Sequence, residues 1–390
     1  MSATAPPRIP IVRPALGEEE IAAATRVIRS GWVSQGPEVA AFETEFAAAV
    51  GAPHAVAVAN CTVALQVALL AAGVKPGDDV VTVSHSFVAT ANAVVAVGAR
   101  PVFADVRRET LGMDPASLDA VITPRTRAIL CVHQVGMPCD LAGILEVASR
   151  HGLPVIEDAA CAIGSEVQWH GRWERIGRPH GTIACFSFHP RKVVTTGDGG
   201  MLTTADETLA RRFRLLRQHA MTVADTVRHQ ATTVVFEDYL EPAFNFRMTD
   251  LQAAVGRPQL ARLAAIVAER RRRADRFYQA LSGNFVVQPH ADQPWTRSNW
   301  QSYPVFLRPD CGISQVAALQ HFLDLGIACK RGVGNAHQEV AYADRSRWAG
   351  GPLTESEWLR DNTILLPLFH GMTDEEQDRV IEACRSLPHA

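Results

Sequence analysis

Residues 54–73, HAVAVANCTVALQVALLAAG, place a short β-rich run before an apolar stretch of good helix formers that ends at a glycine. A glycine in this position caps a helix because it adopts the left-handed backbone conformation without steric cost. Three expected helices share this ending: Val63–Ala72 before Gly73, Val88–Val97 before Gly98, and Ala142–His151 before Gly152. Strands that alternate with such helices predict an α/β fold with a mostly parallel sheet and helices on its faces.

Polar and reactive side chains stand at the ends of the expected strands. These strands are His54–Ala59, Asp79–Ser84, Arg127–His133, Pro154–Glu157 and Thr182–Phe188. Ligands of open α/β sheets bind outside the carboxyl ends of the strands, so the residues that follow the strands are candidates for a functional site. They are Cys61, Thr62, Phe87, His133, Asp158 and Ser187.

The pattern changes after about residue 258. A long amphipathic helix comes first, followed by shorter strand-like pieces such as Ser302–Leu307 and by a final helix in Thr373–Arg385. The length of 390 residues also exceeds the roughly 250–300 over which one hydrophobic core usually grows. We therefore expect two domains, a large α/β domain in residues 1–257 and a smaller C-terminal α+β domain in residues 258–390.

The composition is that of an ordinary globular protein, with 47% hydrophobic and 20% charged residues. A net charge of −3 argues against a nucleic-acid surface, and no apolar run reaches the length of a bilayer span. We therefore expect neither nucleic acid nor a membrane as partner. The first residues lack the basic stretch and the unbroken apolar segment of a secretory signal, which predicts a cytoplasmic protein.

Two further features favour ordinary structural roles. The basic run Glu269–Arg273 follows a helical pattern and is interpreted as a solvated helix face rather than as a polyanion site. The eight cysteines form no CxxC pair and stand mostly among apolar residues. They are therefore interpreted as reduced core thiols, and neither a disulfide framework nor a metal site is expected.

Asp158 ends the apolar run that begins at Leu153. A carboxylate at the buried end of a strand is costly unless it meets a cation or several donors. A protonated pyridine nitrogen would be one such cation, and keeping that nitrogen protonated makes pyridoxal 5'-phosphate (PLP) an electron sink. For a single aspartate, a helix cap or a partner for an arginine is the alternative interpretation.

The segments CFSFHPRK (residues 185–192) and TTGDGG (residues 195–200) bring Ser187 and Lys192 into a glycine-rich turn after a buried strand. This order supplies a phosphate ligand and an amine close together, with a backbone able to approach a cofactor. Lys192 would form an imine with an aldehyde provided that its neighbours leave part of the amine uncharged. An isolated lysine is usually a solvated surface group, and the combination favours the catalytic interpretation.

Two weaker signals complete the set. Asn60, Cys61 and Thr62 begin an expected helix, where free N–H groups and the helix dipole attract an anion, although simple N-capping explains the same residues. Phe87 follows a strand and would lie flat on an aromatic cofactor, with core packing as the alternative. Together the candidates supply an amine, a partner for a pyridine nitrogen, a phosphate site and a stacking face.

Four longer motifs follow one another along the chain: VIEDAACAIGS (155–165), FSFHPRKVVTTGDGGML (186–202), FNFRMTDLQAAVG (244–256) and KRGVGNAHQEVAY (330–342). With them the chain resembles the DegT/DnrJ/EryC1/StrS family of PLP-dependent sugar aminotransferases, from Gly31 to the last helix. The resemblance implies the fold type I architecture of the aspartate aminotransferase superfamily. That architecture has a large domain with a mostly parallel seven-stranded sheet sandwiched by helices, plus a smaller C-terminal α+β domain.

The resemblance also implies roles for single residues. Lys192 matches the Schiff-base lysine, which also moves the proton during transamination, and Asp158 matches the carboxylate on the pyridine nitrogen. Phe87 matches the aromatic ring that stacks on the cofactor. The residues that match the phosphate site are Cys61 through its backbone, Thr62, Ser187 and Asn245. Because the family's asparagine reaches the phosphate of the other subunit, a homodimer with shared active sites is implied.

Cys161 departs from the family pattern, which usually has Gln or Glu near the phenolic oxygen of the cofactor. A thiol is a weaker hydrogen-bond partner than an amide or a carboxylate, so the tuning of the imine's pKa differs here, whereas transamination is expected to survive. Lys192 itself is intact. Family members that dehydrate a keto-deoxy sugar typically have histidine in its place, which makes a dehydratase the less favoured interpretation.

The resemblance implies two half-reactions, in which an amino acid, most simply glutamate, converts PLP to pyridoxamine 5'-phosphate and a ketone then takes the nitrogen. The expected acceptor is a nucleotide-linked 4-keto- or 3-keto-6-deoxyhexose, with Lys330, Arg331 and His337 as candidate contacts to its anionic part. Three alternatives stay open: a keto-cyclitol acceptor, a PLP-binding sensor or regulator without turnover, and a structural α/β protein whose glycines only make turns.

Overall fold

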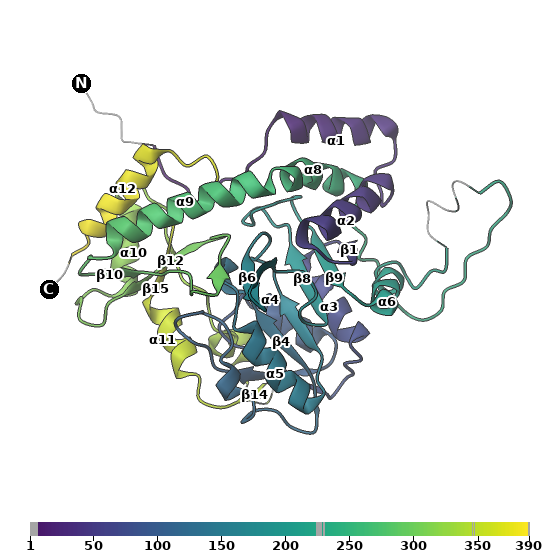
Figure 1. Cartoon of the computed structure of the whole chain (residues 1–390), viewed down its shortest axis with the longest axis horizontal. Coiled ribbons are helices and arrows are strands. Elements are labelled where there is room, and N and C mark those ends of the chain that lie inside the picture. Colours follow the sequence, from purple (N-terminus) through teal and green to yellow (C-terminus); the bar gives the residue numbers. More distant parts are fainter. Residues whose placement is uncertain (1–6, 224–227, 229–230, 345, 347, 389–390) are drawn as a thin grey trace.

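The computed structural model describes residues 7–223, 228, 231–344, 346 and 348–388. The first six residues, part of the N-terminal stretch used to predict a cytoplasmic location, lie outside the described part of the chain. Within the described ranges, no helix is both long and apolar enough to cross a membrane. The chain forms a large sheet and a smaller one, and a long helix runs between them (Figure 1).

The large sheet contains the strands that the alternating pattern predicts. Its order is β1 (His54–Val58), β9 (Gly200–Thr204), β8 (Ile183–Ser187), β5 (Val155–Asp158), β4 (Thr126–Val132), β2 (Asp79–Val83), β3 (Arg100–Ala104) and β14 (Ala349–Gly350). β9 runs antiparallel to both neighbours, and the other neighbouring strands are parallel. The first seven strands are the expected seven-stranded sheet, and the two-residue β14 from the C-terminal part extends it.

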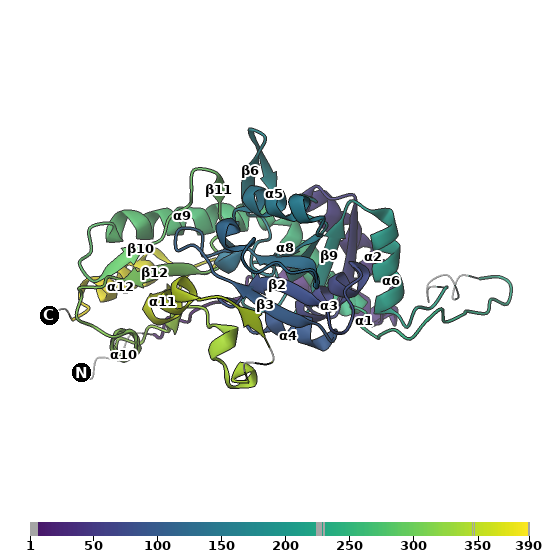
Figure 2. The same ribbon diagram turned by 90° about the horizontal axis from the view of Figure 1, so that it is seen from below.

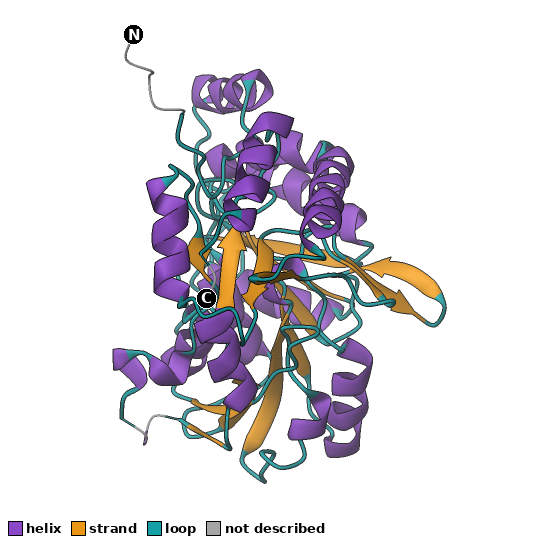
Figure 3. Ribbon diagram, turned by 90° about the vertical axis from the view of Figure 1, so that its left-hand side faces the viewer, coloured by secondary structure: helices purple, strands orange, loops and turns teal. Residues whose placement is uncertain are grey.

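Helices cover both faces of the large sheet (Figure 3). One face carries α3 (Cys61–Ala71), α4 (Ala89–Ala96) and α6 (Glu207–Arg217). The other face carries α2 (Pro37–Val50), α5 (Leu141–His151) and α8 (Asp250–Ala261), and α1 (Glu18–Ser30) packs on α8. Because both faces are covered, β2, β8 and β9 are buried along their whole length.

The three predicted glycine caps are confirmed. Gly73, Gly98 and Gly152 follow α3, α4 and α5 with φ angles of 84°, 78° and 63°. These angles lie in the left-handed region, which glycine adopts without the steric cost that a Cβ would bring. Each glycine therefore turns the chain from the end of a helix toward the next strand.

The C-terminal part forms its own core around a four-stranded sheet in the order β10 (Val287–Pro289), β12 (Tyr303–Leu307), β15 (Thr363–Leu366) and β13 (Lys330–Arg331). Its helices are α10 (Gln315–Asp324), α11 (Thr354–Asn362) and α12 (Asp374–Arg385). A third sheet, β11 (Thr296–Arg297), β6 (Glu166–Trp169) and β7 (Arg172–Arg175), projects from the body (Figure 2). The helix α9 (Leu263–Leu281) packs its first residues into a core of the large sheet and its last ones into the C-terminal core, so the domain boundary at residue 258 stays a prediction.

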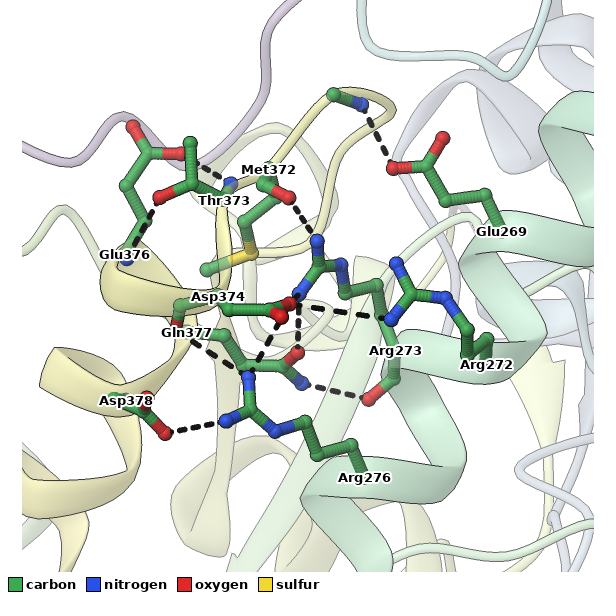
Figure 4. Close-up of polar contacts among 11 residues, drawn as sticks. Glu269, Arg272, Arg273, Arg276, Met372, Thr373, Asp374, Glu376, Gln377 and Asp378 are labelled. Atoms are coloured by element: carbon green, nitrogen blue, oxygen red, sulfur yellow. Dashed lines mark hydrogen bonds and ion pairs between the residues drawn. The ribbon is translucent and has the colours of Figure 1, made fainter.

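The prediction that Glu269–Arg273 forms a solvated helix face is wrong for Arg270 and Arg273, which are buried. Arg270 donates to three backbone carbonyls, those of Trp300, Gln301 and Leu368. Arg273 donates to the carbonyl of Met372 and to the side chains of Asp374 and Gln377 (Figure 4). Burial is tolerated because these oxygens accept hydrogen bonds from Nε and Nη2 of Arg270 and from Nη1 and Nη2 of Arg273, although Nε of Arg273 has no partner among the described residues. The basic run thus fastens α9 to the C-terminal part.

Candidate active site

Two adjoining cavities lie at the carboxyl ends of the central strands. The first cavity, of about 650 Å³, is lined among others by Asn60, Cys61, Thr62, Phe87, Thr90, His133, Asp158, Ser187 and Lys192. The second cavity, of about 680 Å³, reaches the C-terminal part and is lined among others by Arg191, Gln301, Lys330, Arg331, Asn335 and Glu339. Six residues line both cavities: Ser86, Phe87, Gln134, Cys161, Arg191 and Lys192. All six candidates from the strand ends therefore line the first cavity.

Asp158 ends β5 as a buried carboxylate on the floor of the first cavity. Its Oδ2 accepts a hydrogen bond from Thr90 Oγ1 at 2.8 Å, and its Oδ1 accepts one from the N–H of Ala160 at 3.1 Å. Burial raises the pKa of Asp158, and these hydrogen bonds and Lys192 oppose that rise only in part. Among the described residues Asp158 forms no ion pair, so a cation at this point of the cavity would stabilise its charged form.

Lys192 lies in the turn after β8, where its N–H donates to the carbonyl of His189 at 2.8 Å. Its Nζ donates to Cys161 Sγ at 3.1 Å where the two cavities meet. Burial lowers the pKa of Lys192, but the contact with Cys161 and the charge of Asp158 outweigh burial, so the pKa lies above its usual value. The amine is therefore held in place by the groups that surround the first cavity.

The start of α3 offers an anion site in the first cavity. Asn60 caps the helix by accepting the N–H of Val63 at 3.0 Å, which leaves the N–H groups of Cys61 and Thr62 without partners in the helix. Ser187, at the end of β8, lines the same cavity, and its Oγ accepts the N–H of His189 at 3.4 Å. Gly200 on β9 is required here, because a Cβ would lie 2.5 Å from the carbonyl of Asn60.

Phe87 is 73% exposed and lines both cavities, so it is not a core residue. Lys330 and Arg331 form β13 on the far wall of the second cavity. Neither His337 nor Asn245, the two remaining candidates, lines the first or the second cavity. His337 contacts Ser84 Oγ at 2.6 Å and Glu357 at 3.2 Å, and Asn245 is exposed in the segment after α6.

Several lining residues gave no signal in the sequence. Thr90 holds Asp158 from α4, and Gln134 and Gln301 contribute to the cavities from segments between regular elements. Their roles depend on tertiary contacts alone. His133, left without a role by the sequence, pairs its Nε2 with Glu157 at 3.0 Å and accepts the N–H of Cys139 on Nδ1. The ring thus links the end of β4 to β5 through Nε2 and to the loop before α5 through Nδ1.

The residues of the first cavity fit PLP. Asp158 is a buried carboxylate in need of a cation, which a protonated pyridine nitrogen supplies. The start of α3 and Ser187 offer donors to a phosphate, and Lys192 offers the amine for an aldehyde. This combination on such a sheet defines a PLP-dependent enzyme of fold type I. The chain belongs to the DegT/DnrJ/EryC1/StrS aminotransferase family, whose family model matches residues 14–385.

Solved structures agree with this assignment. The chain is similar to the aminotransferase TlmJ from Streptoalloteichus hindustanus, with 32% identity over 97% of this chain and 98% of that one and a TM-score of 0.87. It is similar to DesV from S. venezuelae, solved in complex with a ketimine intermediate, with 33% identity, the same coverage and a TM-score of 0.88. An aminotransferase from Psychrobacter cryohalolentis shows 30% identity, 97% and 98% coverage, and a TM-score of 0.88. The predicted family, fold class and cofactor are confirmed, and the chain is a PLP-dependent aminotransferase.

Proposed function

We propose that the enzyme moves an amino group from an amino acid, most simply L-glutamate, to the ketone of a nucleotide-linked 4-keto- or 3-keto-6-deoxyhexose. The observation that supports this acceptor is the second cavity, which opens from Lys192 and has cationic side chains on its walls. A keto-cyclitol would use the same cofactor site but would carry no diphosphate to match those cations. The site is proposed to work in a cytoplasmic homodimer.

The cations of the second cavity are short of counter-charges. Burial lowers the pKa of Lys330, and the neighbouring charges of Arg191 and Arg331 lower it further. Arg331 pairs with Glu339 at 3.5 Å, whereas Arg191 and Lys330 have no ion-pair partner in the described part of the chain. A diphosphate between them would relieve this repulsion, because an opposite charge within a few ångströms stabilises each cation.

Each residue of the first cavity then has a defined task. Bound PLP supplies an electron sink. Asp158 holds the proton at the pyridine nitrogen, and the hydroxyls of Thr62 and Ser187 donate to the phosphate. Phe87 covers the face of the ring. Lys192 serves both as the amine that anchors the aldehyde and as the base and acid that moves the proton in each half of the reaction.

The acceptor is tested by offering the enzyme, loaded with glutamate nitrogen, a set of ketones. We expect nucleotide-linked keto-6-deoxyhexoses to be aminated, with the KM raised about tenfold in Lys330→Ala because one charge-assisted contact is lost. The exposed Lys75→Ala is the control, and its KM should match the wild type. Amination of a keto-cyclitol in preference to every nucleotide-linked ketone would contradict this acceptor. Turnover of no ketone would favour a sensor or regulator.

The homodimer proposal is supported by residues 231–244 after α6, which extend away from the body (Figures 1 and 2). These residues expose large apolar side chains, with Val234 83% and Phe236 87% exposed, as expected of a surface that a second copy covers. Asn245 lies exposed at the base of this segment.

Mixing two inactive variants tests whether the sites are shared. In a hybrid of Lys192→Ala and Asn245→Ala subunits, one site carries both changes and the other carries neither. We expect the mixture to regain activity that neither parent has, whereas an activity equal to the average of the parents would contradict a site built from two subunits. Light scattering gives the mass of the assembly, and cell fractionation gives its location.

A further inference from the structure

Cys161 and Lys192 face each other at the junction of the two cavities, with Lys192 Nζ 3.1 Å from Cys161 Sγ. Both partners are fixed by their backbones. The amide of Asn299 donates to the carbonyl of Cys161 at 2.8 Å, and the N–H of Lys192 donates to the carbonyl of His189 at 2.8 Å. The backbones that carry the thiol and the amine are therefore fixed, and the two side chains meet between them.

Cys161 differs from the other cysteines in being both accessible and next to a cation. It is partly exposed and lines both cavities. Cys61 and Cys185 are buried nearby, and burial raises the pKa of each thiol well above its usual value. Cys329 is partly exposed, but burial raises its pKa too, and it lines neither cavity. The pKa of Cys139 is lowered to about 6 by its neighbours, but Cys139 is fully buried. Because an oxidant must reach the sulfur, Cys161 is the cysteine that it attacks first.

We propose that Cys161 and Lys192 form a covalent modification site, at which a hydroperoxide joins the cysteine sulfur to the lysine nitrogen. In the first step the sulfur attacks the peroxide, the O–O bond breaks, and a sulfenic acid and water (for an organic peroxide, an alcohol) result. The sulfur is oxidised by two electrons and the peroxide is reduced. In the second step Lys192 Nζ attacks the sulfur, the S–O bond breaks, and water leaves with one proton from the nitrogen. The protein is then two hydrogen atoms lighter and carries an S–N bond.

The surroundings of Lys192 favour the second step, which requires an uncharged amine. Burial lowers the pKa of Lys192, and the contact with Cys161 is the first of the effects that oppose burial, ahead of Asp158. Conversion of the thiol to a sulfenic acid takes away that contact with the thiol, so fewer groups oppose the effect of burial on the amine. The first step therefore prepares the nucleophile for the second, at a distance already short enough for contact.

The consequence of the link rests on the proposed function of Lys192. A nitrogen bound to sulfur is not available for the cofactor aldehyde, so amino transfer stops until a thiol reductant breaks the S–N bond. A nitrogen that already holds PLP is protected. The link should thus form in cofactor-free enzyme and in enzyme loaded with pyridoxamine 5'-phosphate, and not in enzyme loaded with PLP.

The test treats these three forms of the full-length protein with hydrogen peroxide and maps the peptides by mass spectrometry. We expect a crosslink between the peptides of Cys161 and Lys192 in the first two forms, reversed by dithiothreitol and missing from Cys161→Ser. The matched control Cys329→Ser should keep the crosslink. In Lys192→Ala, dimedone should trap the sulfenic acid at Cys161, because no amine competes for the sulfur.

Two results would overturn the proposal. One is wild-type protein in which Cys161 is oxidised to unlinked sulfenic or sulfinic acid as readily as in Lys192→Ala. The other is prior oxidation of a different cysteine. The crosslink is measured as a peptide mass and not as activity, so failure of the crosslinking proposal is distinguishable from failure of the amino-transfer proposal. Failure of the amino-transfer proposal would show as an absorbance spectrum that does not respond to an amino donor.

Discussion

Replacing Asp158 with asparagine should separate catalysis from stability. Asparagine keeps the shape of the side chain and an oxygen for the Thr90 hydroxyl, which lies 2.8 Å away, but carries no charge. Burial raises the pKa of Asp158 above its ordinary value of 3.8. A carboxyl group with a raised pKa in the folded state stabilises the fold while it is protonated, and that contribution is lost as the pH rises through the folded pKa. At neutral pH the buried charge of Asp158 therefore lowers the free energy of unfolding of the wild type, and the uncharged variant avoids this loss.

We expect cofactor-free Asp158→Asn to unfold at an equal or higher urea concentration than the wild type at pH 7, with the difference narrowing toward pH 4.5. The rate of amino transfer should change in the opposite direction. Loss of a hydrogen bond to a charged group costs about 1.5–3 kcal/mol, so kcat/KM should fall about ten- to hundredfold. The assay is urea unfolding of the cofactor-free protein beside the glutamate-driven change of absorbance of the loaded protein.

Two outcomes would refute this reasoning. An unchanged transfer rate would mean that Asp158 does not hold the pyridine nitrogen. A variant less stable than the wild type at pH 7 would mean that the acceptor lost to the Ala160 N–H, which asparagine cannot replace while its oxygen serves Thr90, outweighs the cost of burying the charge.

Further substitutions test the packing behind the site. Gly200→Ala should lower the free energy of unfolding by about 1–3 kcal/mol because the new Cβ would lie 2.5 Å from the carbonyl of Asn60 at the start of α3. Gly283→Ala is the control, because a Cβ there meets open space and should leave the free energy of unfolding unchanged. Equal urea midpoints of the two variants would contradict the prediction. Arg270→Met should lower the free energy of unfolding by about 3 kcal/mol or more because it leaves buried carbonyls unpaired. The exposed Arg272→Met should change it by no more than about 0.5 kcal/mol. Small effects of both substitutions would contradict the role of Arg270 in pairing these carbonyls. Thr62→Ala should weaken pyridoxamine 5'-phosphate binding about tenfold in a fluorescence titration, and unchanged affinity would remove Thr62 from the phosphate site.

The sequence predicts the central fold well because the pattern that specifies each strand and helix lies in neighbouring residues. A buried strand, a run of helix formers and a glycine recur, and Gly73, Gly98 and Gly152 adopt the expected backbone angles. Strand β3 (Arg100–Ala104) was not expected, since its five residues include a proline and give little periodicity. Strand β14 is two residues long and is defined only by its partner on β3, which no local pattern reveals.

Site residues can be predicted where a reactive side chain stands at or just after the end of a strand, as Asp158 and Lys192 do. Contacts made across the fold are not. Thr90 reaches Asp158 from a helix, and nothing in the sequence distinguishes it from the neighbouring polar residues Ser86 and Asn92. Arg270 stands in a basic run that normally faces water, and only the carbonyls supplied by the C-terminal part explain its burial. The role of Asn245 depends on a second subunit and stays a prediction.

The most direct test of the central claim is the absorbance spectrum of the protein with PLP, before and after glutamate, beside Lys192→Ala. If Lys192 is the Schiff-base lysine, the wild type should show an imine band that gives way to a pyridoxamine-type band with glutamate, and the variant should not cycle. A wild type that binds PLP but does not respond to any amino donor, or a variant that cycles as the wild type does, would contradict the account.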